Sequence, residues 1–78
     1  MLTGVQIRTA RAALGWSVSK LATESCVSAR TINRIEGQSG EFNTTAANIK
    51  LIRETLEAAG VEFIGSEGEG PGVRLWRR

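Results

Sequence analysis

Polar and basic side chains recur at helical spacing between residues 28 and 34. Asn33 and Arg34 lie three and four residues after Arg30, so a helix would carry them, with Ala29, on its outer face. A helix with small polar and basic residues on that face can enter the major groove of duplex DNA, which is about 12 Å wide. These residues favour nucleic-acid recognition, and the alternative is that they are merely solvated.

The residue types that the chain lacks exclude most enzyme chemistry. The sequence contains no histidine and no aspartate, and Cys26 is its single cysteine. A histidine general base or catalytic triad therefore cannot be built. One cysteine forms neither an internal disulfide nor a usual zinc site. We expect a protein that is not an enzyme and that uses no metal or cofactor.

Length and charge set a second limit. The 78 residues allow one domain, and the net charge of +2 is unevenly distributed. Residues 1–39 contain five basic and two acidic residues, whereas residues 40–78 contain five basic and six acidic residues. A basic N-terminal half is compatible with a polyanionic partner.

No segment of the sequence is suited to a membrane. No run approaches the roughly 18 consecutive apolar residues of a membrane-spanning helix. Residues 1–4 lack the charged start and apolar run of a signal peptide. We therefore expect a cytoplasmic protein that contacts no membrane.

Caps and apolar spacing predict a first and a last long helix. The first runs from residue 2 or 3 to residue 14, and Thr3 and Gln6 have the spacing of a capping box. The last is capped near Thr44 or Thr45 and ends before Gly60. Its apolar residues recur at intervals of three and four and form one stripe: Ile49, Ile52, Leu56 and Ala59.

Two shorter helices are predicted between them. One begins after a cap at Ser17 and ends near Glu24, and the other begins after a cap at Ser28 and ends near Glu36. Residues 25–27 form a tight connection. This layout is a helix-turn-helix, in which the second helix enters the major groove and the first lies across it.

After residue 60 the sequence takes the period of β-strands. Residues 61–64 and 73–76 predict two short strands, joined by the glycine-rich residues 65–72. We therefore divide the chain into a DNA-binding domain at 1–60 and a hairpin arm at 61–78. Because a two-stranded sheet is marginal alone and has open edges, we expect the arm to form a dimer interface, with helix four as the alternative. The apolar residues of this predicted interface are Val61, Phe63, Val73, Leu75 and Trp76.

Small and apolar residues also recur at fixed offsets, in Gly15-Trp16-Ser17, Leu21-Ala22, Val27-Ser28, Thr31-Ile32 and Ile35-Glu36-Gly37. Over about residues 3–60 the chain resembles the Cro/C1-type (XRE) helix-turn-helix family of bacterial regulators. The resemblance implies a mainly α, lambda-repressor-like DNA-binding domain of four to five helices with a short C-terminal β-hairpin. It places the motif at about residues 17–36.

The resemblance also implies roles for single residues. A buried arginine of helix one and a glutamate that ends helix three form a structural ion pair in this family, and these positions match Arg11 and Glu36. The positions that read bases match Ser28, Ala29, Arg30 and Arg34, with Asn33 beside them. Phosphate contacts are expected from the start of helix two and from the loop after helix three: Ser17, Lys20, Gln38 and Ser39.

The chain departs from the family pattern at two positions. Val18 occupies the place of a glutamine that often contacts phosphate, so phosphate binding must use other groups. Cys26 stands where the turn commonly has glycine, and a left-handed conformation there would be strained by about 1 kcal/mol or more. We interpret Cys26 as a partly buried thiol that tolerates the turn, and the alternative is a redox sensor.

These patterns predict a sequence-specific transcription regulator that binds double-stranded DNA. We expect a repressor that acts as a homodimer on a palindromic operator, because one subunit reads only about half a site. The alternative is an antitoxin or anti-activator module whose C-terminal hairpin binds another protein, a toxin or an activator.

Overall fold

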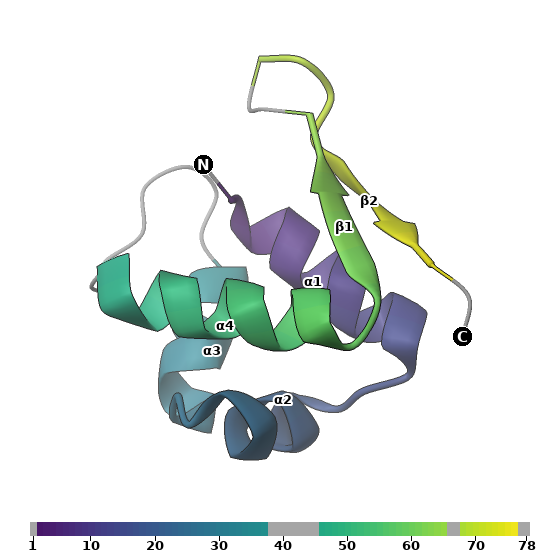
Figure 1. Cartoon of the computed structure of the whole chain (residues 1–78). Helices are drawn as coiled ribbons and strands as arrows, with labels where there is room; N and C mark the ends of the chain where they lie inside the picture. Colours follow the sequence, from purple (N-terminus) through teal and green to yellow (C-terminus); the bar gives the residue numbers. More distant parts are fainter. Residues whose placement is uncertain (1, 38–45, 66–67, 77–78) are drawn as a thin grey trace.

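The described residues form four helices and one antiparallel hairpin (Figure 1). The computed structural model describes residues 2–37, 46–65 and 68–76. Its elements are, in chain order, α1 (Gly4–Leu14), α2 (Val18–Ser25), α3 (Ala29–Glu36), α4 (Ala46–Ala58), β1 (Val61–Ile64) and β2 (Gly72–Leu75). The expected mainly helical fold with a C-terminal β-hairpin is confirmed. The predicted caps of the last helix, Thr44 and Thr45, lie outside the described residues.

Side-chain caps begin the first three helices as their sequences predict. The Thr3 hydroxyl accepts a hydrogen bond from the Gln6 backbone N–H at 3.1 Å, and Gln6 Oε1 accepts one from the Thr3 N–H at 3.0 Å. The hydroxyls of Ser17 and Ser28 cap α2 and α3 in the same way, each accepting from the N–H three residues later. Each cap satisfies a backbone donor that the helix itself leaves unpaired.

One hydrophobic core joins all the helices to the hairpin. Ile52 and Leu56 of α4 are fully buried, while Ile49 is half-buried and packs against the same core. The buried core residues are Leu2, Ile7, Ala10, Leu21, Val27, Ile32, Ile35, Ile52, Leu56 and Val61. No helix in the described ranges is long and apolar enough to cross a membrane.

The hairpin lies along α1 and follows directly from α4 (Figure 1). Its strands pair Val61 with Leu75 and Ile64 with Gly72. The side chain of Gln6, which is 2% exposed, donates from Nε2 to the carbonyl oxygens of Ile64 at 3.1 Å and Gly72 at 3.0 Å. At the other end, the Trp76 N–H donates to the Gly60 oxygen at 2.7 Å. The hairpin is therefore bonded to the helical domain near both of its ends.

Much of the apolar face of the hairpin is already covered within one chain. Val61 is only 3% exposed within one chain, so it is a core residue and is not available to a partner. Phe63 and Val73 are half-buried against the same core. Of the five residues assigned to a dimer interface, only Leu75 (41%) and Trp76 (56%) remain exposed. The helical domain covers more of the hairpin than expected because β2 packs on α1.

Candidate nucleic-acid interface

The turn between α2 and α3 is held by its backbone and by two buried residues. Cys26 ends α2 with φ of 63°, in the left-handed region, and its N–H donates to the Ala22 oxygen at 3.0 Å. The buried hydroxyl of Ser25 accepts from the Val27 N–H at 3.3 Å, and Val27 is 3% exposed. The strained conformation expected for Cys26 is present. Its side chain is exposed, however, which corrects the expectation of a partly buried thiol.

Helix α3 is amphipathic, with apolar residues on one face and polar residues on the other. Ile32 and Ile35 are completely buried in the core. Arg30, Asn33 and Arg34 are exposed on the other face, and Ala29 is half-buried at the start of the helix. Neither arginine forms an ion pair within the described part of the chain. The face therefore offers two uncompensated guanidinium groups and one amide, which are donors suited to the edges of base pairs.

Thr31 is a polar residue of this region that sequence reasoning missed. The Ser28 hydroxyl caps α3 and also donates to Thr31 Oγ1 at 2.9 Å. Ser28 is thereby occupied by two bonds to one residue. The Thr31 hydroxyl, which is half-buried, still has its own proton to donate. The signal was in the sequence: a hydroxyl residue three positions after a serine cap.

Lys20 and Ser17, which are expected to contact phosphate, each already have a partner within the chain. Lys20 Nζ lies 3.1 Å from a carboxylate oxygen of Glu24 and 5.3 Å from the ring centroid of Trp16. The charge of Lys20 is thus partly compensated, although both side chains are nearly half exposed and such a pair is weak. The Ser17 hydroxyl accepts the Lys20 N–H and is used as a cap. Gln38 and Ser39 lie outside the described residues.

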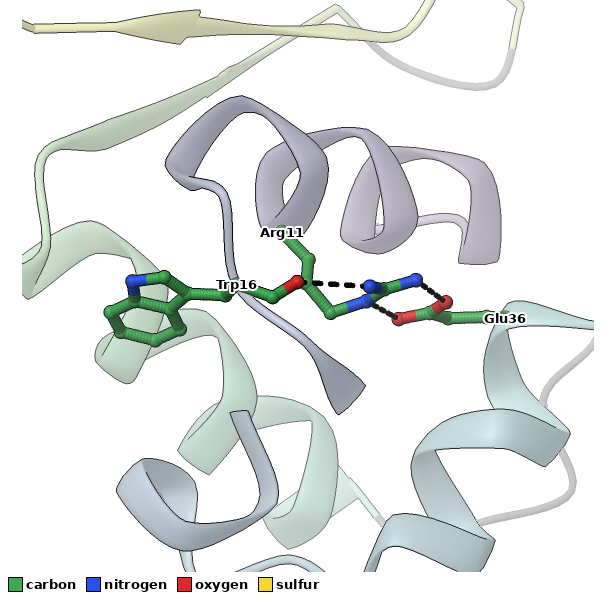
Figure 2. A network of polar contacts seen from close by, with 3 residues as sticks. All are labelled: Arg11, Trp16 and Glu36. Atoms are coloured by element: carbon green, nitrogen blue, oxygen red, sulfur yellow. Dashed lines mark hydrogen bonds and ion pairs between the residues drawn. The ribbon is translucent and has the colours of Figure 1, made fainter. Parts of the chain in front are cut away.

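Arg11 and Glu36 join the last turn of α1 to the end of α3 (Figure 2). Arg11 Nε donates to Glu36 Oε2 at 2.9 Å and Nη2 donates to Oε1 at 2.8 Å, while Nη1 donates to the Trp16 backbone oxygen at 3.0 Å. The side chains are 18% and 7% exposed. The hydrogen bond to Glu36 raises the pKa of Arg11 above its usual value, against the opposing effect of burial. The pair fixes α3 relative to α1 and to the segment that leads into α2.

Comparison with known proteins agrees with this geometry. A family model described as helix-turn-helix matches residues 7–59, which is more than half of the chain. The match includes all of α2, the turn, α3 and α4. None of the curated proteins that were compared matches the chain.

Proposed function

The chain belongs to the Cro/C1-type (XRE) helix-turn-helix family of DNA-binding transcription regulators, and from this premise we propose that it is a repressor that binds a palindromic operator as a homodimer. The observation that carries the proposal is the exposed face of α3. Arg30, Asn33 and Arg34 project from a helix whose opposite face is completely buried. A rigid helix that presents basic and amide side chains is the element that reads the major groove in such proteins.

The arrangement of the polar residues supports separate roles in the proposed complex. Arg30 and Arg34 would form paired hydrogen bonds to guanine, and Asn33 could pair with adenine. Ala29 would contact a thymine methyl group. Phosphates would be bound by the first N–H groups of α2, since helix N-termini attract anions, and by Ser17, Lys20, Gln38 and Ser39. Ser28 would belong with the base-reading residues at the start of α3. Repression would result from occupation of a promoter, and a protein with this role on bacterial DNA would act in the cytoplasm.

A homodimer supports this function because a single α3 covers only half of a typical operator. A two-fold protein matches a palindrome, and its two reading helices must lie about 34 Å apart, one turn of DNA. Leu75 and Trp76 are exposed apolar residues at the end of β2 and are candidates for the subunit contact. The outer face of α4, with the exposed Leu51, is the other.

Footprinting on the DNA upstream of the protein's own gene tests the proposal directly. We expect protection of two half-sites separated by one helical turn. The affinity should fall steeply with salt, with a log–log slope of about −0.9 for each phosphate that is neutralised. A control duplex of scrambled sequence should bind more weakly and keep a salt dependence. Binding to a specific site with a slope near zero would contradict the electrostatic part of the proposal.

The same exposed hairpin end favours a second candidate, an antitoxin or anti-activator. Leu75 and Trp76 could then contact a different protein rather than a second copy of the chain. The two candidates differ in one measurement. A regulator of its own promoter protects operator DNA when purified alone, whereas an interaction module would need its partner present to act.

A further inference from the structure

A groove of about 520 Å³ separates the C-terminal part of α2 from the outer face of α4. Its apolar lining includes the half-buried Trp16, the exposed Leu51 and Ala58. Its polar lining includes the carboxylates of Glu24 and Glu54, and the thiol of Cys26. None of the residues that line it is basic. The groove is therefore an apolar surface bordered by negative charge, and none of the DNA-reading residues of α3 lines it.

The C-terminal end of the chain has the opposite character. Leu75 and Trp76 are among the most exposed large apolar residues that the structure describes, at 41% and 56%. Arg74 lies beside Trp76, with its guanidinium carbon 5.6 Å from a ring centroid of the indole. Both residues also contact Glu62, because Trp76 Nε1 donates to Glu62 Oε1 at 2.9 Å and Arg74 Nη1 lies 3.4 Å from the same oxygen. In the sequence two further arginines follow Trp76, and no acidic residue occurs after residue 69. This end is an exposed apolar pair in a segment whose sequence contains three arginines, of which Arg74 is held by Glu62 in an exposed and therefore weak ion pair.

We propose that the groove receives the C-terminal end of a second copy of the chain, with Trp76 seated against Leu51 and Ala58. The argument is charge complementarity. Within the described residues Glu54 has no ion pair, so it is available to a partner's arginine. Glu24 is held only by the exposed pair with Lys20. Complementary charges at the rim of an interface select the partner and its orientation.

The position of Trp76 makes the contact reciprocal. The Trp76 N–H is bonded to the oxygen of Gly60, and Gly60 follows Ala59, which lines the groove. In Figure 1 the end of β2 and the end of α4 accordingly lie on the same side of the molecule. A two-fold axis near this point would bring the end of each chain to the other chain's groove. Such an isologous contact closes at two subunits.

The dimer would leave the reading face of α3 free. Arg30, Asn33 and Arg34 are absent from both the groove and the C-terminal end. The inference rests on the homodimer of the proposed function and names its surface, but it does not depend on DNA binding. Self-association can therefore be measured without DNA.

Sedimentation equilibrium of the full chain at micromolar concentrations tests the proposal. Leu51→Glu puts a charge into the groove from an exposed helix position, so the fold should be preserved. Trp76→Ser removes the residue that is inserted. We expect each to weaken dimerisation by about 30-fold or more, as is typical when a central aromatic anchor is lost. Val5→Glu is the matched control, because Val5 is 50% exposed on α1 and does not line the groove.

The single cysteine provides a second readout. Cys26 lines the groove and is exposed in one chain, so its reaction with a soluble thiol reagent should slow as the wild-type chain dimerises. In Trp76→Ser the rate should no longer depend on protein concentration. An equal mixture of Leu51→Glu and Trp76→Ser should recover part of the dimer, because the mixed pair retains one intact groove facing one intact C-terminal end.

Three outcomes would overturn the proposal. The first is a wild-type chain that stays monomeric at these concentrations. The second is a folded Leu51→Glu chain that dimerises as well as Val5→Glu. The third is a reaction rate of Cys26 that does not change when the chain dimerises. Failure of the repressor proposal looks different. Groove variants should keep the weak, salt-dependent binding of a single α3 to DNA, whereas a protein that is not a DNA-binding regulator would dimerise normally and bind no DNA.

Discussion

At the scale of single residues, three donors of one arginine connect distant parts of the domain. Arg11 bonds Glu36 twice and the Trp16 oxygen once, so α1, the segment before α2 and the end of α3 meet at one guanidinium. A buried ion pair contributes little net stability compared with apolar residues, but loss of one partner leaves an uncompensated charge. Because the pKa of Arg11 is raised, its contribution is complete below its usual pKa and is lost only at extreme alkaline pH.

Replacing Arg11 by methionine should lower the free energy of unfolding by about 3–5 kcal/mol, because Glu36 would be left buried and unpaired. Urea denaturation followed by circular dichroism measures this loss. Arg8→Met is the matched control, since Arg8 is an exposed arginine on the same helix. A change there of more than about 0.5 kcal/mol is not expected. Equal losses in the two variants would show that the pair does not hold the domain together.

Arg30 is the residue of α3 whose removal should change specificity most clearly. Arg30→Ala should weaken operator binding by about 1–3 kcal/mol and relax the preference at one position in each half-site. Lys20→Ala is the comparison. It should weaken operator and random DNA alike and only slightly, because Glu24 already compensates part of its charge. Titrations on both DNAs decide the point, and an unchanged ratio in Arg30→Ala would mean that Arg30 does not read a base.

At the scale of elements, the turn of the helix-turn-helix carries strain that a change of residue can relieve. Cys26 is the one non-glycine residue with positive φ in the described part of the chain. A side chain in this conformation costs about 1–2 kcal/mol. Since Val27 and Ser25 on either side are buried, the turn holds Cys26 in place.

Cys26→Gly should therefore stabilise the fold, by about 1 kcal/mol. The melting temperature measures the gain. Cys26→Ala distinguishes the effect of backbone strain from the effect of the thiol, because alanine keeps the strained Cβ and removes the sulfur. It should leave stability and DNA binding nearly unchanged. If Cys26→Ala instead lost an oxidant-dependent change in DNA affinity, the thiol would be a redox sensor after all.

Gln6 holds the hairpin against α1 through two hydrogen bonds from a buried amide. Gln6→Glu keeps the capping acceptor but removes both donors and places a carboxylate beside two carbonyl oxygens. We expect a loss of about 2 kcal/mol or more, and faster amide exchange in β1 and β2. Thr3→Ala is the control, because it removes only the cap, at about 1 kcal/mol. If Gln6→Glu destabilised the chain while the amides of β1 and β2 stayed protected from exchange, the lost stability would not come from the hairpin.

At the scale of the whole molecule, the hairpin belongs to the folding unit. Val61 is in the core, and Phe63 and Val73 pack against it. A chain that ends at Gly60 should therefore lose about 3 kcal/mol or more, whatever its state of assembly. Leu75→Ser in the full chain is the comparison, since Leu75 is 41% exposed and should matter little to a monomer. Denaturation at low concentration separates folding from assembly, and a truncated chain as stable as the full one would contradict this packing.

The sequence by itself determined the elements that depend on neighbours along the chain. The caps at Thr3, Ser17 and Ser28 and the polar face of α3 follow from interactions between residues at most four positions apart. Such interactions are the same wherever the helix lies, so local patterns predict them. The placement of Arg11 and Glu36 needed the family resemblance in addition.

Only the tertiary structure decided what the C-terminal residues do. The bonds from Gln6 to Ile64 and Gly72 span 58 and 66 residues, and no local pattern predicts them. They bring β2 onto α1, which places Val61 in the core and leaves Leu75 and Trp76 exposed. The groove between α2 and α4 likewise depends on how the helices pack. Alternation in the two strands showed that one face must be buried, but burial against the chain itself and burial against a partner produce the same alternation.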